Sequence, residues 1–126
     1  MKPLTILVVD DDPDMRLYMR GCLQAMGQDV GSVLGAADGY EALQVLSEAS
    51  VDLIISDVVL PRMDGRTLLK AIRDDPVRQH LPVLLISGKA QVMPPLSPAD
   101  AWLSKPFNAR QLLAAVRRLM GQPPSP

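Results

Sequence analysis

The chain of 126 residues is 48% hydrophobic and 21% charged, which is typical of one globular domain and excludes a largely disordered chain. Its net charge of −1 combines 11 acidic and 4 basic residues up to residue 65 with 3 acidic and 9 basic residues after it, so we expect an acidic pocket and no basic face for direct contact with nucleic acid. No apolar run approaches the ~20 residues that span a bilayer, and the single Cys22 cannot form an internal disulfide, so we expect a cytoplasmic protein without membrane contact.

The first two predicted elements are a strand and a helix. Residues 4–9 are almost continuously apolar and rich in branched side chains, as in a strand that is covered on both faces. Asp12 is the expected N-cap of the following helix, with Pro13 at its first position and Gly27 at its end. The inward face of this helix is one apolar stripe at helical spacing, made of Met15, Tyr18, Met19, Cys22, Leu23 and Met26.

The middle of the chain predicts two further strands and two helices. The strand within residues 30–36 is the weaker one because it contains two glycines. Asp38 and Glu41 predict a capping box at the start of the next helix. Residues 51–56 form a buried strand that ends at Asp57. A loop then leads to a helix whose inward residues are Leu68, Leu69 and Ile72.

Two more strands are expected in the last third of the chain. Residues 83–86 are apolar and end at Ser87, and the short run of residues 101–104 ends at Lys105. His80 lies in the polar connection before the first of these strands and has no acid or nucleophile close to it in the sequence. We therefore expect His80 at the surface.

Asn108 and Gln111 predict a capping box at the start of the last helix, and Gly121 ends that helix. The inward residues of this helix are Leu112, Leu113, Val116, Leu119 and Met120. We expect one domain over residues 1–120, followed by a disordered tail or linker stub over residues 121–126.

Strands that alternate with helices predict an α/β fold, in which a mostly parallel, doubly wound sheet of five strands carries helices on both faces. In such sheets the ligand site lies beyond the carboxyl ends of the strands. The residues that follow the apolar runs are therefore the candidate site residues: Asp10, Asp11, Asp57, Ser87 and Lys105.

These residue types predict phosphoryl chemistry. Three carboxylates that meet at one point repel each other unless a cation lies between them, and Mg²⁺ prefers such oxygen ligands. The hydroxyl of Ser87 can donate to a phosphoryl oxygen, and the ammonium group of Lys105 can neutralise another. A carboxylate can itself act as a nucleophile and form an acyl phosphate.

Four pieces of the sequence, each at the end of its own predicted strand, resemble the receiver domains of bacterial two-component response regulators. The pieces are ILVVDD at residues 6–11, DVVLPRMDG at 57–65, SG at 87–88 and KPF at 105–107. The resemblance covers about residues 4–120. It implies a flavodoxin-like fold with the strand order 2-1-3-4-5.

The resemblance also implies roles for the acidic residues. Asp57 corresponds to the phosphoacceptor of the family. Asp10 and Asp11 correspond to its Mg²⁺ ligands, together with Asp57 and the backbone carbonyl of Val59. On this basis we expect Mg²⁺ as the cofactor.

Residues on the last two strands match the phosphate-binding and switch positions of the family. Lys105 matches the phosphate-binding lysine, and the peptide bond between Lys105 and Pro106 is often cis in the family. Ser87 and Trp102 match the switch pair, in which the hydroxyl moves toward the phosphoryl group and the aromatic ring turns inward. Trp102 is equally well interpreted as a core residue.

The chain departs from the family pattern between Ser87 and Lys105, which are separated by 17 residues, fewer than is usual. Pro94, Pro95 and Pro98 lie where the fourth helix of the family belongs. An interior proline costs about 3 kcal/mol in a helix. We therefore predict that the fourth helix is missing or shortened, so that the phosphorylation chemistry is kept while the surface used for dimerisation and output differs.

The resulting hypothesis is a receiver domain that takes a phosphoryl group onto Asp57 from a histidine kinase or phosphotransfer protein and signals to a downstream effector protein. Homodimerisation stays open as a further contact. We expect no enzymatic activity beyond self-catalysed phosphorylation and dephosphorylation. The tail after Gly121 is too short for an effector domain, so the output is a separate protein or the chain is a fragment of a larger regulator or hybrid kinase.

A calcium loop of the EF-hand type is a rival hypothesis, because Asp10, Asp12 and Asp14 have the required spacing. It fails on two positions of the loop. Met15 stands where glycine is needed, and Gly21 stands where a bidentate acid is needed.

A phosphatase and a degenerate receiver are the remaining rival hypotheses. A phosphatase of the haloacid dehalogenase type would use Asp10 and Asp12, but it would leave Asp57 without a role. A degenerate receiver would bind its partner without phosphorylation. The predicted loss of a helix favours the degenerate receiver, whereas the presence of Asp57 and Lys105 argues against it.

Overall fold

Five parallel strands form the centre of the fold. The computed structural model describes residues 3–88 and 100–121, and in these residues the strands lie in the order β2-β1-β3-β4-β5, with every neighbouring pair parallel. This arrangement confirms the predicted doubly wound α/β fold and its strand order. The strands are β1 (Leu4–Val9), β2 (Val30–Ala36), β3 (Leu53–Asp57), β4 (Val83–Ser87) and β5 (Ala101–Ser104).

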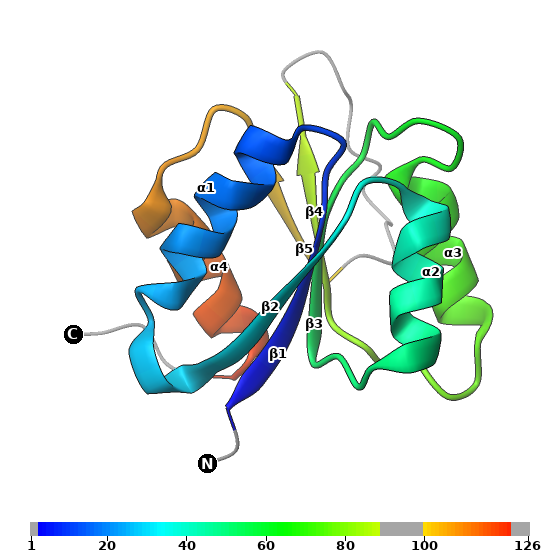
Figure 1. Cartoon of the computed structure of the whole chain (residues 1–126), viewed down its shortest axis with the longest axis horizontal. Helices are drawn as coiled ribbons and strands as arrows, with labels where there is room; N and C mark the ends of the chain where they lie inside the picture. The colour runs from blue at the N-terminus through cyan, green and yellow to red at the C-terminus, as the bar shows by residue number, and fades with distance from the viewer. Residues whose placement is uncertain (1–2, 89–99, 122–126) are drawn as a thin grey trace.

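Helices cover both faces of this sheet (Figure 1). Helices α1 and α4 pack side by side on one face, and α2 and α3 pack together on the other. The helices are α1 (Pro13–Gln24), α2 (Gly39–Glu48), α3 (Gly65–Asp74) and α4 (Ala109–Leu119), with a short 3-10 turn, η1 (Gly27–Asp29), before β2.

The core has two halves, one on each face of the sheet. Leu7 of β1 and Ile54 of β3 pack toward α2 and α3. Their neighbours in sequence, Ile6 and Ile55, pack toward α1 and α4. Successive side chains of a strand point to opposite faces, so a strand that is buried on both faces has to be apolar throughout. This is why β1, β3 and β4 are mostly aliphatic, with the polar residues Ser56, Asp57 and Ser87 at the carboxyl ends of β3 and β4.

Side-chain caps begin the helices where the sequence predicts. Asp12 accepts from the backbone N–H of Asp14 at 2.9 Å, and Asn108 forms the full capping box with Gln111. Asp38 accepts from the N–H of Glu41 at 2.9 Å, but in the residues that the structure describes the Glu41 side chain does not accept from the backbone N–H of Asp38 in return. The predicted box at α2 is therefore only half formed.

Two predicted boundaries differ from the structure. β3 begins at Leu53 and not at residue 51; just before it, the backbone N–H of Asp52 donates to the carbonyl of Thr5, and the Asp52 carboxylate accepts from the N–H of Thr5, each at 2.8 Å. Helix α1 ends at Gln24, and Gly27, with φ +70°, starts η1. Each difference arises from a contact or turn that the apolar pattern does not encode.

One residue of the predicted inward stripe of α1 is misplaced. Tyr18 is 45% exposed, and its ring lies 6.4 Å, between centroids, from the ring of Phe107. Met19 and Leu23, on the same stripe, are fully buried as predicted. Tyr18 therefore sits at the edge of the stripe, against the loop before α4.

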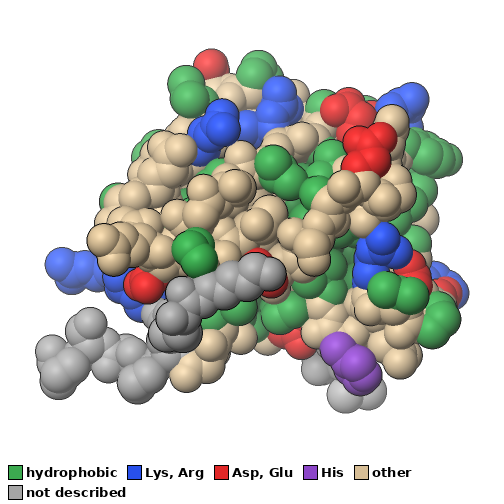
Figure 2. All heavy atoms as spheres, turned by 60° about the horizontal axis from the view of Figure 1, so that its bottom comes forward, with side chains coloured by type: hydrophobic (Ala, Val, Ile, Leu, Met, Phe, Trp, Pro, Cys, Tyr) green, Lys and Arg blue, Asp and Glu red, His purple; other side chains and the backbone are tan. Residues whose placement is uncertain are grey.

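His80 is exposed, as predicted, at the end of the molecule where β4 begins (Figure 2). The predictions for the fourth helix, within residues 91–99, and for the tail beyond residue 121 lie outside the described residues. None of the helices in residues 3–88 and 100–121 has the length and apolar run that a bilayer crossing requires.

Candidate functional site

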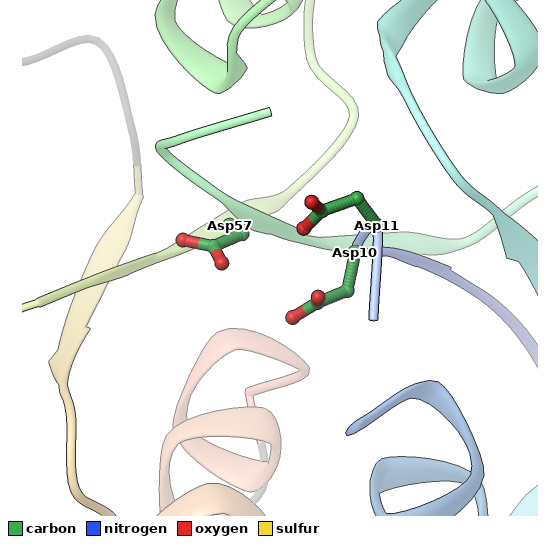
Figure 3. A group of neighbouring side chains, drawn as sticks. All are labelled: Asp10, Asp11 and Asp57. Carbon is green, nitrogen blue, oxygen red and sulfur yellow. The ribbon is translucent and has the colours of Figure 1, made fainter. Parts of the chain in front are cut away.

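Three carboxylates meet at the carboxyl edge of the sheet. Asp10 and Asp11 directly follow β1, and Asp57 is the last residue of β3. The two strands are neighbours, with Val9 opposite Ser56, so their ends meet at the same edge. One carboxylate oxygen from each aspartate lies within 4.8 Å of the others (Figure 3). We call Asp10, Asp11 and Asp57 the carboxylate cluster, and it confirms the expected acidic site.

Asp10 is the most buried member of the carboxylate cluster, with 2% of its surface exposed. Its Oδ1 accepts from the backbone N–H of Asp12 at 2.9 Å, whereas its Oδ2 is buried without a hydrogen-bond partner. Burial raises the pKa of Asp10 above its ordinary value of 3.8; the Asp12 N–H opposes this shift, and the charge of Asp57 adds to it. An unpartnered buried carboxylate oxygen is costly unless a cation meets it.

Lys105 lies directly against Asp57. Its Nζ donates to Asp57 Oδ2 at 2.6 Å, and its backbone N–H donates to the carbonyl of Ser87 at 2.8 Å. Burial acts to lower the pKa of Lys105, but the hydrogen bond and charge of Asp57, with the charges of Asp10 and Asp11, outweigh it and raise that pKa. The ammonium group therefore stays charged beside the carboxylate cluster.

Ser87 ends β4, the strand next to Asp57, and Trp102 lies on β5, one strand further out. Asp57 pairs with Ile86, so the buried Ser87 lies one residue beyond it on β4. Trp102 pairs with Leu85 across β4 and β5, and its half-buried side chain packs against the core on the α2 and α3 face. The peptide bond from Lys105 to Pro106 is cis, as the family resemblance implies.

Val59 follows the carboxylate cluster on the loop between β3 and α3. Its backbone N–H is 3.4 Å from Asp57 Oδ1, and its side chain is 60% exposed. These contacts place the Val59 peptide next to Asp57.

Three residues that the sequence reasoning did not single out also shape this edge. Gly65 approaches so closely that a Cβ there would lie 2.3 Å from the carbonyl oxygen of Asp57. Arg16 on α1 donates to the carbonyl of Asp10. Arg62, in the loop between β3 and α3, binds Asp38. Of the three, Arg62 and Gly65 lie in the piece DVVLPRMDG that carries the family resemblance, and Arg16 lies outside the quoted pieces.

The donor atoms fit a hard divalent cation. All are carboxylate oxygens, and one of them, Asp10 Oδ2, is buried without any partner. Mg²⁺ is commonly held by one or two carboxylates together with phosphate oxygens. The calcium loop and the phosphatase, which both need Asp12, do not fit, because the Asp12 carboxylate caps α1 and does not join the carboxylate cluster.

The fold and this edge define an α/β domain with an acidic, lysine-bearing site at the carboxyl ends of its strands. Residues 6–117 match the response regulator receiver domain, and the chain belongs to this family. It is therefore a signalling domain of two-component systems.

Relatives of known sequence or structure agree with this assignment. Over 119 residues the chain is 35% identical to the sensor histidine kinase TmoS of Ectopseudomonas mendocina, a match that covers 91% of this chain and 12% of that protein. The chemotaxis response regulator CheY4 of Vibrio cholerae is 34% identical, with a TM-score of 0.81 over 93% of this chain and 98% of that chain. The response regulator TrrA of Thermotoga maritima, solved with Mg²⁺ and BeF, is 30% identical, with a TM-score of 0.81 over 92% and 98%.

The chain corresponds to only part of its curated relatives. It spans between 8% and 53% of the length of those it matches. These relatives include sensor kinases and response regulators. The activities of those whole proteins therefore do not transfer to this chain.

Replacing Asp10 by asparagine is expected to stabilise the protein in magnesium-free buffer, by an amount that grows as the pH rises from 3.8 to the raised pKa of the folded state. The folded state holds the Asp10 proton more tightly than the unfolded state does, because the pKa is raised on folding. The free energy of unfolding of the unaltered protein therefore falls as the pH rises through the folded-state pKa of Asp10. Asparagine does not titrate, so the variant does not lose stability in this way. Urea unfolding of both proteins in EDTA over a pH series measures the difference. A difference that stays constant or shrinks as the pH first rises above 3.8 would contradict the account.

Proposed function

We propose that this receiver domain accepts a phosphoryl group on Asp57, with Mg²⁺ bound at the carboxylate cluster, and acts as a phosphorylation-controlled interaction switch. The observation that carries the proposal is the contact of Lys105 Nζ with Asp57, at 2.6 Å, beside three carboxylates whose oxygens lie within 4.8 Å of one another. The set provides a nucleophile, oxygen ligands for a cation and a positive charge for phosphate.

The residues that would hold Mg²⁺ are Asp10, Asp11 and Asp57, together with the backbone carbonyl of Val59. The buried, unpartnered Oδ2 of Asp10 supports this assignment. The Thermotoga relative with bound Mg²⁺ and BeF supports it as well. When bound, the cation would offset the negative charge that collects on the carboxylates and the phosphoryl oxygens.

The transfer step needs little more than positioning. A carboxylate oxygen of Asp57 forms a bond to phosphorus while the bond from phosphorus to the donor nitrogen breaks, and the imidazole of the donor histidine keeps that electron pair. Before transfer the ammonium group of Lys105 neutralises the Asp57 carboxylate, and after transfer it neutralises a phosphoryl oxygen. The product is an acyl phosphate on Asp57.

The proposed switch and partners depend on the same site. The hydroxyl of Ser87, one residue beyond the partner of Asp57 in the sheet, would donate to the phosphoryl group, and Trp102 would respond through its packing on the core. The phosphoryl donor is a histidine kinase or phosphotransfer protein. A downstream effector protein, or a second copy of the chain, reads the changed surface.

Intact mass measurement after incubation with acetyl phosphate tests the proposal. We expect one acid-labile phosphoryl group per chain with Mg²⁺ and none with excess EDTA, because the carboxylates repel the anionic donor unless a cation is present. Tryptophan emission in the same samples reports whether Trp102 responds. An unmodified chain in the presence of Mg²⁺ would contradict the proposal and favour a degenerate receiver that binds its partner without phosphorylation.

A further inference from the structure

The loop between β3 and α3 is fixed at its tip by an ion pair. Arg62 donates from Nε to Asp38 Oδ2 at 3.0 Å, and its terminal nitrogen binds the same oxygen. Asp38 is nearly buried, with 7% of its side chain exposed, whereas Arg62 is 61% exposed. A forked contact to one buried carboxylate holds an arginine in a defined orientation.

This ion pair connects the loop to the start of α2. Asp38 is the N-cap of α2, and its Oδ1 accepts from the N–H of Glu41 at 2.9 Å. The same backbone bond and the hydrogen bond from Arg62 keep the pKa of Asp38 below its ordinary value, so the carboxylate stays charged. The guanidinium carbon of Arg62 also lies 5.3 Å from the centre of the Tyr40 ring, within the range of a cation–π contact.

A second contact fixes the residue that follows Arg62. Met63 packs against the core, and it lies so close to Gly39 that a Cβ there would meet the Met63 sulfur at 2.6 Å. At its base the loop is closed by the bond from the N–H of Gly65 to the carbonyl of Val58, at 2.8 Å. The stretch that contains Val59 is therefore held at both ends.

Arg62 adopts a backbone conformation that arginine rarely takes. Its φ is +64°, and it is the one non-glycine residue with positive φ in the described part of the chain. Such a conformation persists only when surrounding contacts enforce it, and it often occurs beside functional sites. Here the N–H of Met63 donates to the carbonyl of Pro61 at 2.7 Å across Arg62, and the contacts to Asp38 and Tyr40 hold the Arg62 side chain.

We propose that Arg62 is a positioning residue, which holds the loop so that the carbonyl of Val59 faces the divalent cation at the carboxylate cluster. Arg62 lies further along the loop than Val59, and it acts through the loop backbone rather than by touching the cation. The inference rests on the proposed function, because it assumes a cation at the carboxylate cluster. Partners outside the first ligand sphere commonly contribute 10- to 100-fold, roughly, to metal affinity.

Calorimetric titration with Mg²⁺, without any phosphoryl donor, tests this inference. Arg62→Ala is expected to weaken Mg²⁺ binding about 10-fold. Arg78→Ala is the matched control, because Arg78 also pairs with an aspartate, Asp75, and donates to a backbone carbonyl, that of Leu46. It should leave the affinity unchanged, since its contacts lie away from the carboxylate cluster.

Two further variants separate the ion pair from general stability. Asp38→Asn keeps the helix cap, since asparagine caps as well as aspartate does, but it removes the charge that binds Arg62. Arg62→Gly relieves the positive φ and also removes the ion pair. Both should weaken Mg²⁺ binding as Arg62→Ala does. In addition, the amide of Val59 should exchange hydrogen faster in metal-free Arg62→Ala than in the unaltered protein.

The outcomes distinguish the inference from the function on which it rests. If the unaltered chain binds Mg²⁺ and is phosphorylated, and the Arg62 variants bind Mg²⁺ equally well, the positioning role is wrong and the proposed function stands. If the unaltered chain binds no Mg²⁺, both are wrong. Weakened binding by Arg62→Ala, Arg62→Gly and Asp38→Asn, with Arg78→Ala unaffected, supports the role.

Discussion

Asp57→Asn is expected to abolish phosphorylation by acetyl phosphate completely. The amide of asparagine is a poor nucleophile and does not form the acyl phosphate that a carboxylate forms. The fold should persist, because the change removes one of three charges that repel each other within 4.8 Å. Intact mass after incubation with acetyl phosphate and Mg²⁺ should show only the unmodified chain.

Asp64→Asn is the matched control for this experiment. Asp64 also follows β3 in the loop before α3, but its carboxylate caps α3 by accepting from the N–H of Thr67 at 2.9 Å. Asparagine is an equally good N-cap, so both folding and phosphorylation should be unchanged. A phosphoryl adduct that survives in Asp57→Asn would place the acceptor on another residue and overturn the assignment.

Gly65→Ala is expected to lower the free energy of unfolding by about 1–3 kcal/mol, the range typical of overpacking. The added Cβ would lie 2.3 Å from the carbonyl oxygen of Asp57 and 3.0 Å from the Cα of Val58. Both are backbone atoms, so relief requires a shift of the strand end or of α3. Urea unfolding measures the loss. Because Asp57 itself would move, the yield of phosphorylated chain should also fall under conditions where the variant is folded.

Gly21→Ala is the control, and it is expected to raise the free energy of unfolding where Gly65→Ala lowers it. Gly21 lies exposed within α1, and a Cβ there would meet nothing within 4 Å. Alanine in a helix interior is more stable than glycine by about 0.5–1 kcal/mol, so this variant should gain stability. If Gly65→Ala unfolded at the same urea concentration as the unaltered chain, the close approach of α3 to Asp57 would not be a constraint on the fold.

Much of the fold could be predicted because its determinants are local or periodic. β1 and β4 are largely aliphatic, since both of their faces are buried, and a run of this kind is visible in the sequence. The helix starts at Asp12 and Asn108 depend on contacts with residues two or three positions away. The strand order came only from the family resemblance, because no local contact encodes it.

The carboxylate cluster could be predicted for a topological reason. In a parallel sheet all carboxyl ends lie at one edge, so Asp10, Asp57 and Lys105 converge although they are far apart in sequence. The distances confirm this convergence, with Lys105 Nζ 2.6 Å from Asp57 Oδ2. The roles of these residues in binding Mg²⁺ and phosphate stay predictions.

The remaining features depend on long-range contacts between residues without a sequence signal. Arg62 and Asp38 are 24 residues apart, and nothing near Arg62 in the sequence indicates either its positive φ or its partner. Tyr18 fits the apolar stripe of α1 by spacing, yet it lies beside Phe107 at the surface. Helical spacing predicts which face of the helix a side chain lies on. It does not predict whether the neighbouring elements reach far enough to bury that side chain.

A crystal structure of the chain with Mg²⁺ and beryllofluoride, a phosphoryl mimic, tests the central claim most directly. We expect the beryllium atom on a carboxylate oxygen of Asp57, and Mg²⁺ between Asp10, Asp11, Asp57 and the Val59 carbonyl. Lys105 should contact a fluorine. Mg²⁺ or beryllofluoride bound away from Asp57, or an Asp57 side chain that stays paired only with Lys105 at saturating concentrations of both, would contradict the account.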